Sequence, residues 1–200
     1  MSDLLSPLQG HSEPRVVGAG QGEAGVVLTE RRIVSLVQVA AWPETLAQVE
    51  DAIASLTHCA PPQRATGSSA REGTVIMAIG PGRFLIESTD PALAAKLAEG
   101  VPAPLGAVTD LSHARSVVRI AGPQAAWVLA KGLAIDLDPA RFPPLEVAQS
   151  AIHEVGVLVR RVSPDSFDLY VFRGFALSFW DWLTEAAAET GYRVDPPAKV

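Results

Sequence analysis

The sequence has a single cysteine, Cys59, among its 200 residues. One cysteine excludes an intramolecular disulfide and every cysteine-rich metal motif, and it is typical of a protein from a reducing compartment. The sequence also has no apolar stretch of the ~18 residues that a membrane helix needs, and its first residues have no apolar core of signal-peptide length. We therefore expect a cytoplasmic protein without a membrane partner.

Charge is also scarce, since charged residues make up 19% of the chain against 48% for hydrophobic residues. The formal net charge is −6, and no basic tract offsets it. A nucleic-acid partner is not expected, because its phosphate backbone would be repelled. A surface poor in charge suits burial against a protein partner, although the same composition is common in alanine-rich proteins.

The second half of the chain repeats the pattern of the first. Each half reads as a strand, a helix opened by a proline, a two-strand hairpin and a second helix. Pro43 and Pro123 open the corresponding helices, about 80 residues apart. The elements are predicted at 31–40, 43–56, 74–88 and 91–98, and again at 116–120, 123–131, 152–172 and 174–190. This pattern predicts an α+β fold of two βαββα-like repeats, with antiparallel or mixed sheets covered by helices.

The ends of the chain differ from its middle in composition. The first 25 residues are rich in glycine, serine, proline and glutamate, which is typical of a flexible arm. Leu4, Leu5 and Leu8 are candidates for anchoring this arm to a partner. The predicted parts are an arm at 1–25, a first repeat at 26–105, a second repeat at 106–194 and a frayed tail at 195–200. The two repeats are expected to form a single compact domain.

Motifs for catalysis, cofactors and metals are weak in this sequence. Gly20, Gly22 and Gly25 have the spacing of a dinucleotide loop, but the residues that follow read as a strand, whereas the pyrophosphate needs a helix N-terminus. His58 and Cys59 are adjacent, and adjacent residues point apart, which disfavours a nucleophile pair. The histidines have no metal-site spacing; they are His11, His58, His113 and His153. We predict no catalytic, cofactor-binding or metal-binding residue.

One polar cluster allows two interpretations. Asp110, Ser112 and His113 stand at the entry of a predicted strand. The structural interpretation is that Asp110 and Ser112 bond to local backbone N–H groups. The functional alternative is that Asp110 or His113 handles an amine. We favour the structural interpretation.

Aromatic residues are concentrated at the last predicted helix. Phe175, Phe179, Trp182 and Ala186 have the spacing of one buried side. Trp180 lies off this stripe by about 100° or more, so we predict that it is partly exposed and anchors a partner. The alternative is that the loop at 61–73 covers Trp180. The candidate interface residues are Phe172, Phe175, Phe179, Trp180 and Trp182.

The second half resembles a known family. The stretch TDLSHARSVVRIAGPQAAWVLAKGLAIDLDP, then Phe142–Pro144, then FDLYVFRGFALSFWDWL resemble the gamma subunits of heterotetrameric sarcosine oxidases. The likeness is strong over 109–192 and looser before it. D-L-S-H followed by a strand, G-P and a helix is also similar to the folate-binding aminomethyltransferases, to which the glycine-cleavage T-protein belongs. The resemblance implies an aminomethyltransferase-like fold.

The resemblance also implies a function. It places the chain in a complex of alpha, beta, gamma and delta subunits that oxidises sarcosine to glycine, with formation of hydrogen peroxide and 5,10-methylenetetrahydrofolate. It implies FAD, FMN, NAD and tetrahydrofolate in the alpha and beta subunits, zinc in delta and no cofactor in gamma. We expect a non-catalytic structural subunit whose main contact is alpha. The alternatives are a stand-alone folate-binding or aminomethyl-transferring enzyme and an independent oligomeric interaction domain.

The first prediction concerns flavin. Because no helix is expected after the glycines of the N-terminal segment, the chain purified alone should bind neither FAD nor FMN. Its visible absorption spectrum should be flat. A yellow preparation with stoichiometric flavin would contradict this prediction.

Overall fold

The structure is a computed structural model in which two units are distinguished. The described residues are 6–18 and 23–199. One unit contains 33–113 with 145–147, and the other contains the described residues up to 32 with 114–144 and 148–199. We call them the first-repeat unit and the second-repeat unit, because each holds one of the two predicted repeats.

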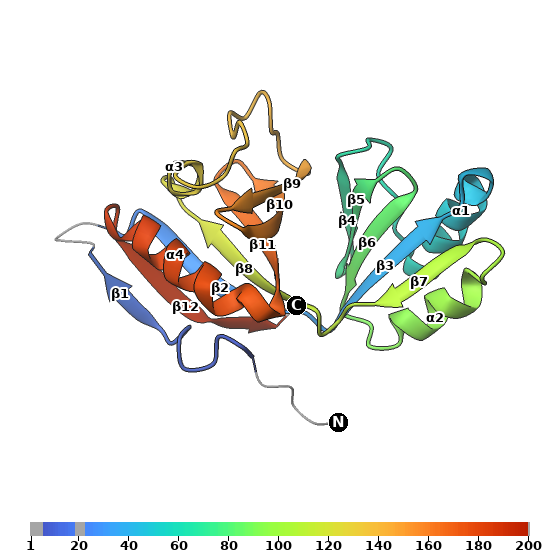
Figure 1. Cartoon of the computed structure of the whole chain (residues 1–200), viewed down its shortest axis with the longest axis horizontal. Helices are drawn as coiled ribbons and strands as arrows, with labels where there is room; N and C mark the ends of the chain where they lie inside the picture. Colours follow the sequence, from blue (N-terminus) through green and yellow to red (C-terminus); the bar gives the residue numbers. More distant parts are fainter. Residues whose placement is uncertain (1–5, 19–22, 200) are drawn as a thin grey trace. The chain divides into compact units, whose positions relative to one another are not determined.

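The first-repeat unit is a five-stranded sheet with two helices on one face (Figure 1). Its elements are β3 (Ser35–Ala41), η1 (Pro43–Thr45), α1 (Leu46–Thr57), β4 (Ser68–Arg71), β5 (Thr74–Gly80), β6 (Arg83–Ser88), α2 (Leu93–Gly100) and β7 (Gly106–Asp110). The strand order is β4-β5-β6-β3-β7, and all neighbours are antiparallel. Ile53 of α1 and Leu97 of α2 are buried in one cluster with Val37 and Val39 of β3.

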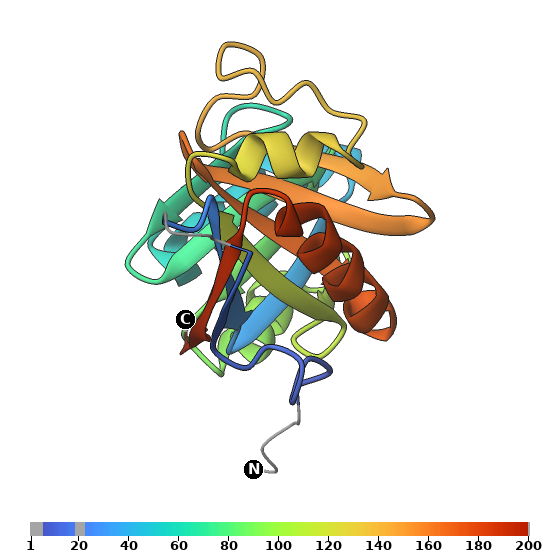
Figure 2. The same ribbon diagram turned by 90° about the vertical axis from the view of Figure 1, so that its left-hand side faces the viewer.

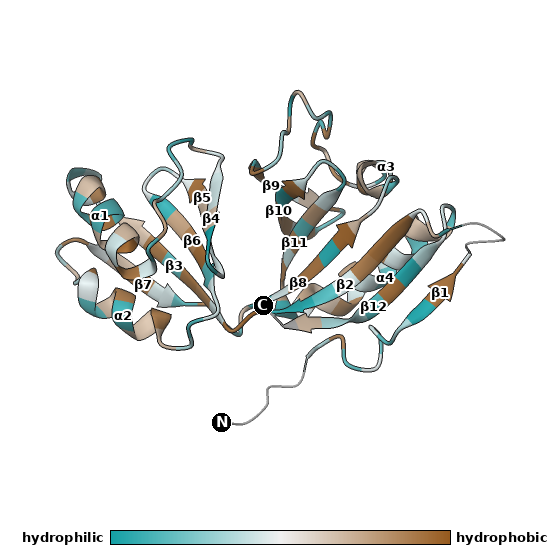
Figure 3. Cartoon of the chain, turned by 180° about the vertical axis from the view of Figure 1, so that it is seen from behind, coloured by the Kyte–Doolittle hydropathy of each residue, from teal (hydrophilic) through white to brown (hydrophobic). Residues whose placement is uncertain are grey.

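The second-repeat unit is a seven-stranded sheet, and Figure 2 shows α3 and α4 over the same face of it. Its elements are β1 (Arg15–Val17), β2 (Val26–Arg32), β8 (Arg115–Ala121), α3 (Ala125–Ala130), β9 (Val147–Ile152), β10 (Val155–Ser163), β11 (Ser166–Phe172), η2 (Arg173–Phe175), α4 (Ala176–Ala188) and β12 (Tyr192–Lys199). The strand order is β1-β12-β2-β8-β11-β10-β9. Figure 3 shows apolar segments along the strands of both units, as two-layer packing requires.

Both units have the same succession of elements. From β3 in one unit and from β8 in the other, each runs strand, helix, three strands, helix, strand, which confirms the predicted α+β fold with a repeated βαββα pattern and adds two strands to each repeat. The added strands are β4 and β7 in one unit and β9 and β12 in the other. The strand orders correspond as well, except that the second-repeat unit has β1 at its edge and β2 inserted. Strand β2 lies between β8 and β12, whereas β3 and β7 are direct neighbours.

The predicted repeat boundaries, 26–105 and 106–194, are wrong by one strand at each end of the first repeat. Strand β2 was assigned to the first repeat but pairs with β8 and β12. Strand β7 was assigned to the second repeat but pairs with β3. Apolar alternation identifies a strand, but it does not identify the partner, which lies far away in the sequence.

The predicted flexible arm is also wrong for the part that the structure describes. Leu8 is fully buried in the core of the second-repeat unit. The hydroxyl groups of Ser6 and Ser12 both donate to the carboxylate of Glu30, the latter over 3.0 Å. Composition predicted disorder because few residues here are apolar, yet one buried leucine and two hydrogen bonds attach the segment. Leu4 and Leu5 lie outside the described residues.

The predicted frayed tail is part of a strand. Strand β12 begins at Tyr192 and runs parallel to β2, with Asp195 opposite Thr29 and Ala198 opposite Arg31. On its other side β12 pairs with β1, where Arg15 lies opposite Val194. Pro196 and Pro197 fall where the register with β2 shifts, which is where a strand accepts residues without a backbone donor.

A buried ion cluster crosses four strands of the second-repeat unit. Asp168 of β11 is fully buried. Its carboxylate accepts hydrogen bonds from Arg119 of β8 at 2.7 and 2.9 Å, from Arg31 of β2 at 3.0 Å and from Arg160 of β10 at 3.4 Å. A buried carboxylate is tolerated only when it is paired in this way, so the cluster fixes the lateral register of these strands.

The second prediction tests the attachment of the N-terminal segment. Leu8→Ala should lower the free energy of unfolding by about 2–5 kcal/mol, because it leaves a cavity in the core. The matched control is Val16→Ala, since Val16 is 63% exposed and should change stability by no more than ~0.5 kcal/mol. Urea unfolding of the isolated chain measures both. Equal stability of the two variants would show that the segment is not part of the core.

Candidate functional site: an exposed aromatic surface

The predicted interface residues separate into a buried and an exposed group. Phe179 and Trp180 are each 1% exposed and lie in the core of the second-repeat unit, and Trp182 packs partly buried against it. Phe172 and Phe175 are 48% and 50% exposed. The predicted exposure of Trp180 is therefore wrong, and the exposed aromatic side chains belong to η2 and the residue before it.

The error for Trp180 has a geometric cause. Phe175 ends a 3₁₀ turn, and α4 begins only at Ala176. Phe175 therefore lies outside the helix, and the predicted stripe was drawn through Trp182, whereas the buried side of α4 is centred on Leu183, about 100° further round the helix. The buried stripe of α4 contains Ala176, Phe179, Trp180, Leu183 and Ala187. Its spacing of i, i+3, i+4, i+7 and i+11 was present in the sequence.

The exposed surface has two parts. The ring of Phe172 lies under the guanidinium group of Arg115, 4.0 Å from the guanidinium carbon. The ring of Phe175 lines a cavity of about 580 Å³ between the start of α4 and the β9–β10 turn. The other residues that line it are Ile152, His153, Glu154, Val155, Ser178, Phe179 and Trp182. Leu177 is a further exposed apolar side chain at the start of α4, at 39%.

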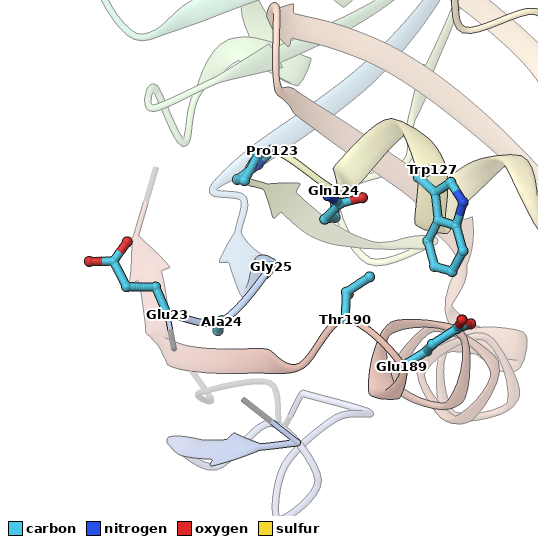
Figure 4. A pocket seen from close by; sticks show the side chains of 8 residues that line it. All are labelled: Glu23, Ala24, Gly25, Pro123, Gln124, Trp127, Glu189 and Thr190. Atoms are coloured by element: carbon cyan, nitrogen blue, oxygen red, sulfur yellow. The ribbon is translucent and has the colours of Figure 1, made fainter. Parts of the chain in front are cut away.

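A second cavity of about 500 Å³ lies beside α3 (Figure 4). Its rim includes Trp127 and Glu189. The ammonium group of Lys131 lies 3.9 Å from the centre of the Trp127 ring, donates to the carbonyl of Ala186 over 2.7 Å and pairs with Glu189 at 3.1 Å. The Glu189 side chain of this rim is thus already paired with Lys131.

The polar cluster at the end of β7 is held by local hydrogen bonds. One carboxylate oxygen of Asp110 accepts from the backbone N–H of Ser112 at 2.9 Å and from its hydroxyl at 2.6 Å. These bonds lower the pKa of Asp110, with a smaller contribution from the charge of His113. The Ser112 hydroxyl oxygen in turn accepts from the backbone N–H of Leu36 over 3.1 Å. The cluster joins the end of β7 to the start of β3.

The glycine-rich segment near the N-terminus packs against the chain itself. Gly20 and Gly22 lie outside the described residues. A Cβ atom on Gly18 would stand 2.7 Å from the carbonyl oxygen of Ala188, and one on Gly25 would stand 2.8 Å from the side chain of Thr190. Strand β2, and not a helix, follows Gly25, so the segment lacks the helix that a dinucleotide loop places directly after its last glycine.

In residues 6–18 and 23–199 no three metal-ligating side chains come together. The carboxylates that line the two cavities are those of Glu23, Glu154 and Glu189, and all three residues are exposed. None of the described helices has the length and apolar character to cross a bilayer.

Comparison with known proteins identifies the family. The model of the GCVT N-terminal domain matches residues 64–194. The sarcosine oxidase gamma subunit of Arthrobacter sp is 31% identical over 185 residues, which are 92% of this chain and 90% of that protein. The chain belongs to the sarcosine oxidase gamma-subunit family. The gamma subunit of Corynebacterium sp. (strain U-96) is 30% identical over 171 residues, 84% of this chain and 82% of that protein.

Solved structures agree with this family. Heterotetrameric sarcosine oxidase from Corynebacterium sp. U-96 contains a chain that superposes with a TM-score of 0.81 at 27% identity, over 93% of this chain and 95% of that chain. Aminomethyltransferase T of the glycine cleavage system from Bartonella henselae superposes with a TM-score of 0.57 at 14% identity, over 84% of this chain but only 50% of that one. The second likeness confirms the predicted aminomethyltransferase-like fold, and the first confirms the predicted family.

The third prediction separates core from surface in the aromatic region. Trp180→Ala should cost about 3–5 kcal/mol of unfolding free energy, because it empties a core position. Phe175→Ala should cost less than about 1 kcal/mol, because half of that side chain is exposed. Guanidinium unfolding of the isolated chain measures the difference. Similar losses for the two variants would place Trp180 and Phe175 in the same environment, against the structure.

Proposed function

We propose that this chain is the gamma subunit of a heterotetrameric sarcosine oxidase and that it serves there as a non-catalytic structural subunit. The observation that carries this proposal is the agreement in length and fold with one subunit of a solved sarcosine oxidase, 95% of which is covered at a TM-score of 0.81. A stand-alone aminomethyltransferase is disfavoured, because the chain spans only half of the aminomethyltransferase it resembles.

The proposed complex oxidatively demethylates sarcosine to glycine, with formation of hydrogen peroxide and 5,10-methylenetetrahydrofolate. We assign FAD, FMN, NAD, tetrahydrofolate and zinc to the partner subunits, in the cytoplasm. The support from this chain is indirect. Its deeply buried carboxylates Asp168 and Glu30 are already bonded within the second-repeat unit, and Gly18 and Gly25 pack against Ala188 and Thr190.

We propose that the alpha subunit is the main contact and that it docks on the start of α4. Phe172, Phe175 and Leu177 are the exposed apolar side chains of this region. Phe179, Trp180 and Trp182 support them from the core side. Exposed aromatic side chains on a rigid, well-packed element are typical anchors of protein interfaces.

We also propose that Asp110, Ser112 and His113 are structural. Asp110 is exposed, and the hydrogen bonds that it accepts come from a residue of its own turn. The lowered pKa of Asp110 means that these bonds favour its ionised form. Their stabilising effect is therefore present above the ordinary carboxyl range and is lost as the pH falls through the lowered pKa.

The fourth prediction tests the subunit assignment. Co-expressed with the neighbouring subunits and carrying the only affinity tag, this chain should recover them in equal stoichiometry, and the complex should oxidise sarcosine. Size-exclusion chromatography and oxygen consumption measure this. A chain that is recovered alone and that binds tetrahydrofolate as a monomer would contradict the proposal.

The same preparation tests the polar cluster. Asp110→Ala should lower stability by no more than ~1 kcal/mol and should leave the turnover of each assembled complex unchanged. The comparison variant Asp90→Ala removes a partly buried turn carboxylate, which accepts from the N–H of Ala92 and also pairs with Lys96. A large loss of turnover in Asp110→Ala alone, with normal assembly, would assign a catalytic function to the cluster.

A further inference from the structure

Arg115 and Phe172 form a cross-strand pair at the edge of the second-repeat unit. Arg115 begins β8, Phe172 ends β11, and the two residues lie directly opposite each other in the sheet. The guanidinium group stacks over the ring at 4.0 Å, a separation typical of a cation–π interaction. The ring remains 48% exposed, so a cation and an apolar surface are presented together.

Arg115 has no anionic partner within the described residues. Its Nε atom is buried and has no hydrogen-bond acceptor there, and no carboxylate of the described chain pairs with it. Burial of the guanidinium lowers the pKa of Arg115, and the ring of Phe172 is the group that it stacks on. A partly buried cation without a partner is unfavourable for the isolated chain.

A second cation–ring pair in the same unit shows the usual arrangement. Lys131 stands over Trp127 at a similar distance, 3.9 Å, and Trp127 is similarly exposed at 44%. Lys131, however, is also bonded to the Ala186 carbonyl and to Glu189. The chain therefore supplies acceptors to one stacked cation and none to the other.

The chemistry of the pair favours a carboxylate. A guanidinium that stacks on a ring can still bind a carboxylate in its own plane through two parallel hydrogen bonds, and at Arg115 these have to come from the two Nη atoms, because Nε is buried. A small free carboxylate would need a cavity to hold it, and neither Arg115 nor Phe172 lines either of the two cavities described above. A second copy docked about a two-fold axis at this pair would bring two unpaired arginines together.

We propose that Arg115 and Phe172 form a docking point for a carboxylate side chain of a partner subunit, with the exposed Phe172 ring packing against the apolar stem of that side chain. The inference rests on the proposed function, since it takes the partner from the proposed complex. Arg115 would add a charged contact to the interface, where the aromatic residues alone would give only apolar contact. Desolvated Arg–carboxylate pairs next to aromatic residues are typical centres of interface affinity.

The test uses the assembled complex with variants of this chain. Arg115→Gln and Phe172→Ala should each raise the dissociation constant of this chain about thirty-fold or more, as loss of an interface anchor does. Arg115→Lys should give an intermediate value, because an ammonium group keeps the charge but loses the two-bond geometry. Added salt should weaken the wild-type complex and should affect Arg115→Gln less. Dilution followed by mass photometry provides the constants.

Lys131→Gln is the matched control, because it removes a stacked cation that already has its partners. It should change the dissociation constant less than about three-fold. The melting temperature of the isolated chain should fall only slightly in Arg115→Gln, since the stacking on Phe172 is lost but no internal ion pair is. If that variant nevertheless fails to fold, Arg115→Lys and Phe172→Ala give the answer.

Three results would overturn the inference. Arg115→Gln and Phe172→Ala that assemble as tightly as the wild type would remove the docking point and leave the proposed function intact. An isolated wild-type chain that dimerises through Arg115 would make a second copy the occupant. A wild-type chain that fails to assemble with the other subunits would instead refute the proposed function, from which the inference takes its partner.

Discussion

Strand β2 is the element on which the architecture of the second-repeat unit depends. It is hydrogen-bonded on both sides, antiparallel to β8 and parallel to β12. Without it β12 would have no neighbour on that side, and β1, which pairs with β12, would lose its place as well. The same strand provides Arg31 to the Asp168 cluster and Glu30 to the serines of the N-terminal segment. One inserted strand thus connects the backbone pairing, the buried charges and the N-terminal segment.

The ion cluster makes this insertion specific. Backbone hydrogen bonds alone would permit β2 to slide along β8, and a slip of one residue would reverse which side chains face the core. Asp168 accepts from arginines of β2, β8 and β10, and removing one member of such a buried cluster leaves uncompensated charge. In the sheet of the second-repeat unit, apolar side chains pack on the helix-covered face and the ion pairs lie on the other face. Both therefore specify the same register of β2 against β8.

Local features of the sequence predicted local structure well. The turn at Gly80–Gly82 and the turn at Pro164 were predicted between strands, because turn residues between apolar runs determine a hairpin locally. The repeat was recognisable in the sequence because both copies have a proline at the start of a helix and turn residues between two apolar runs.

The partner of β2 and the burial of Leu8 were not predictable, because they depend on residues that come at the other end of the chain. The exposure of Trp180 was mispredicted because the buried stripe was drawn through Phe175 and Trp182 instead of Ala176 and Leu183. The pairing of Arg115 with Phe172 likewise appears only once the register of β8 and β11 is known.

The position of β2 beside β12 also has a consequence for synthesis. The first-repeat unit is almost continuous in sequence, so it can fold while the ribosome is still making the rest of the chain. The other unit cannot, because β12 is made long after β2. Until then β2 has an open edge, which is the kind of surface that invites pairing with other chains. The second-repeat unit therefore completes its sheet only once β12 has emerged, and it is the part of the molecule that stays open longest during synthesis.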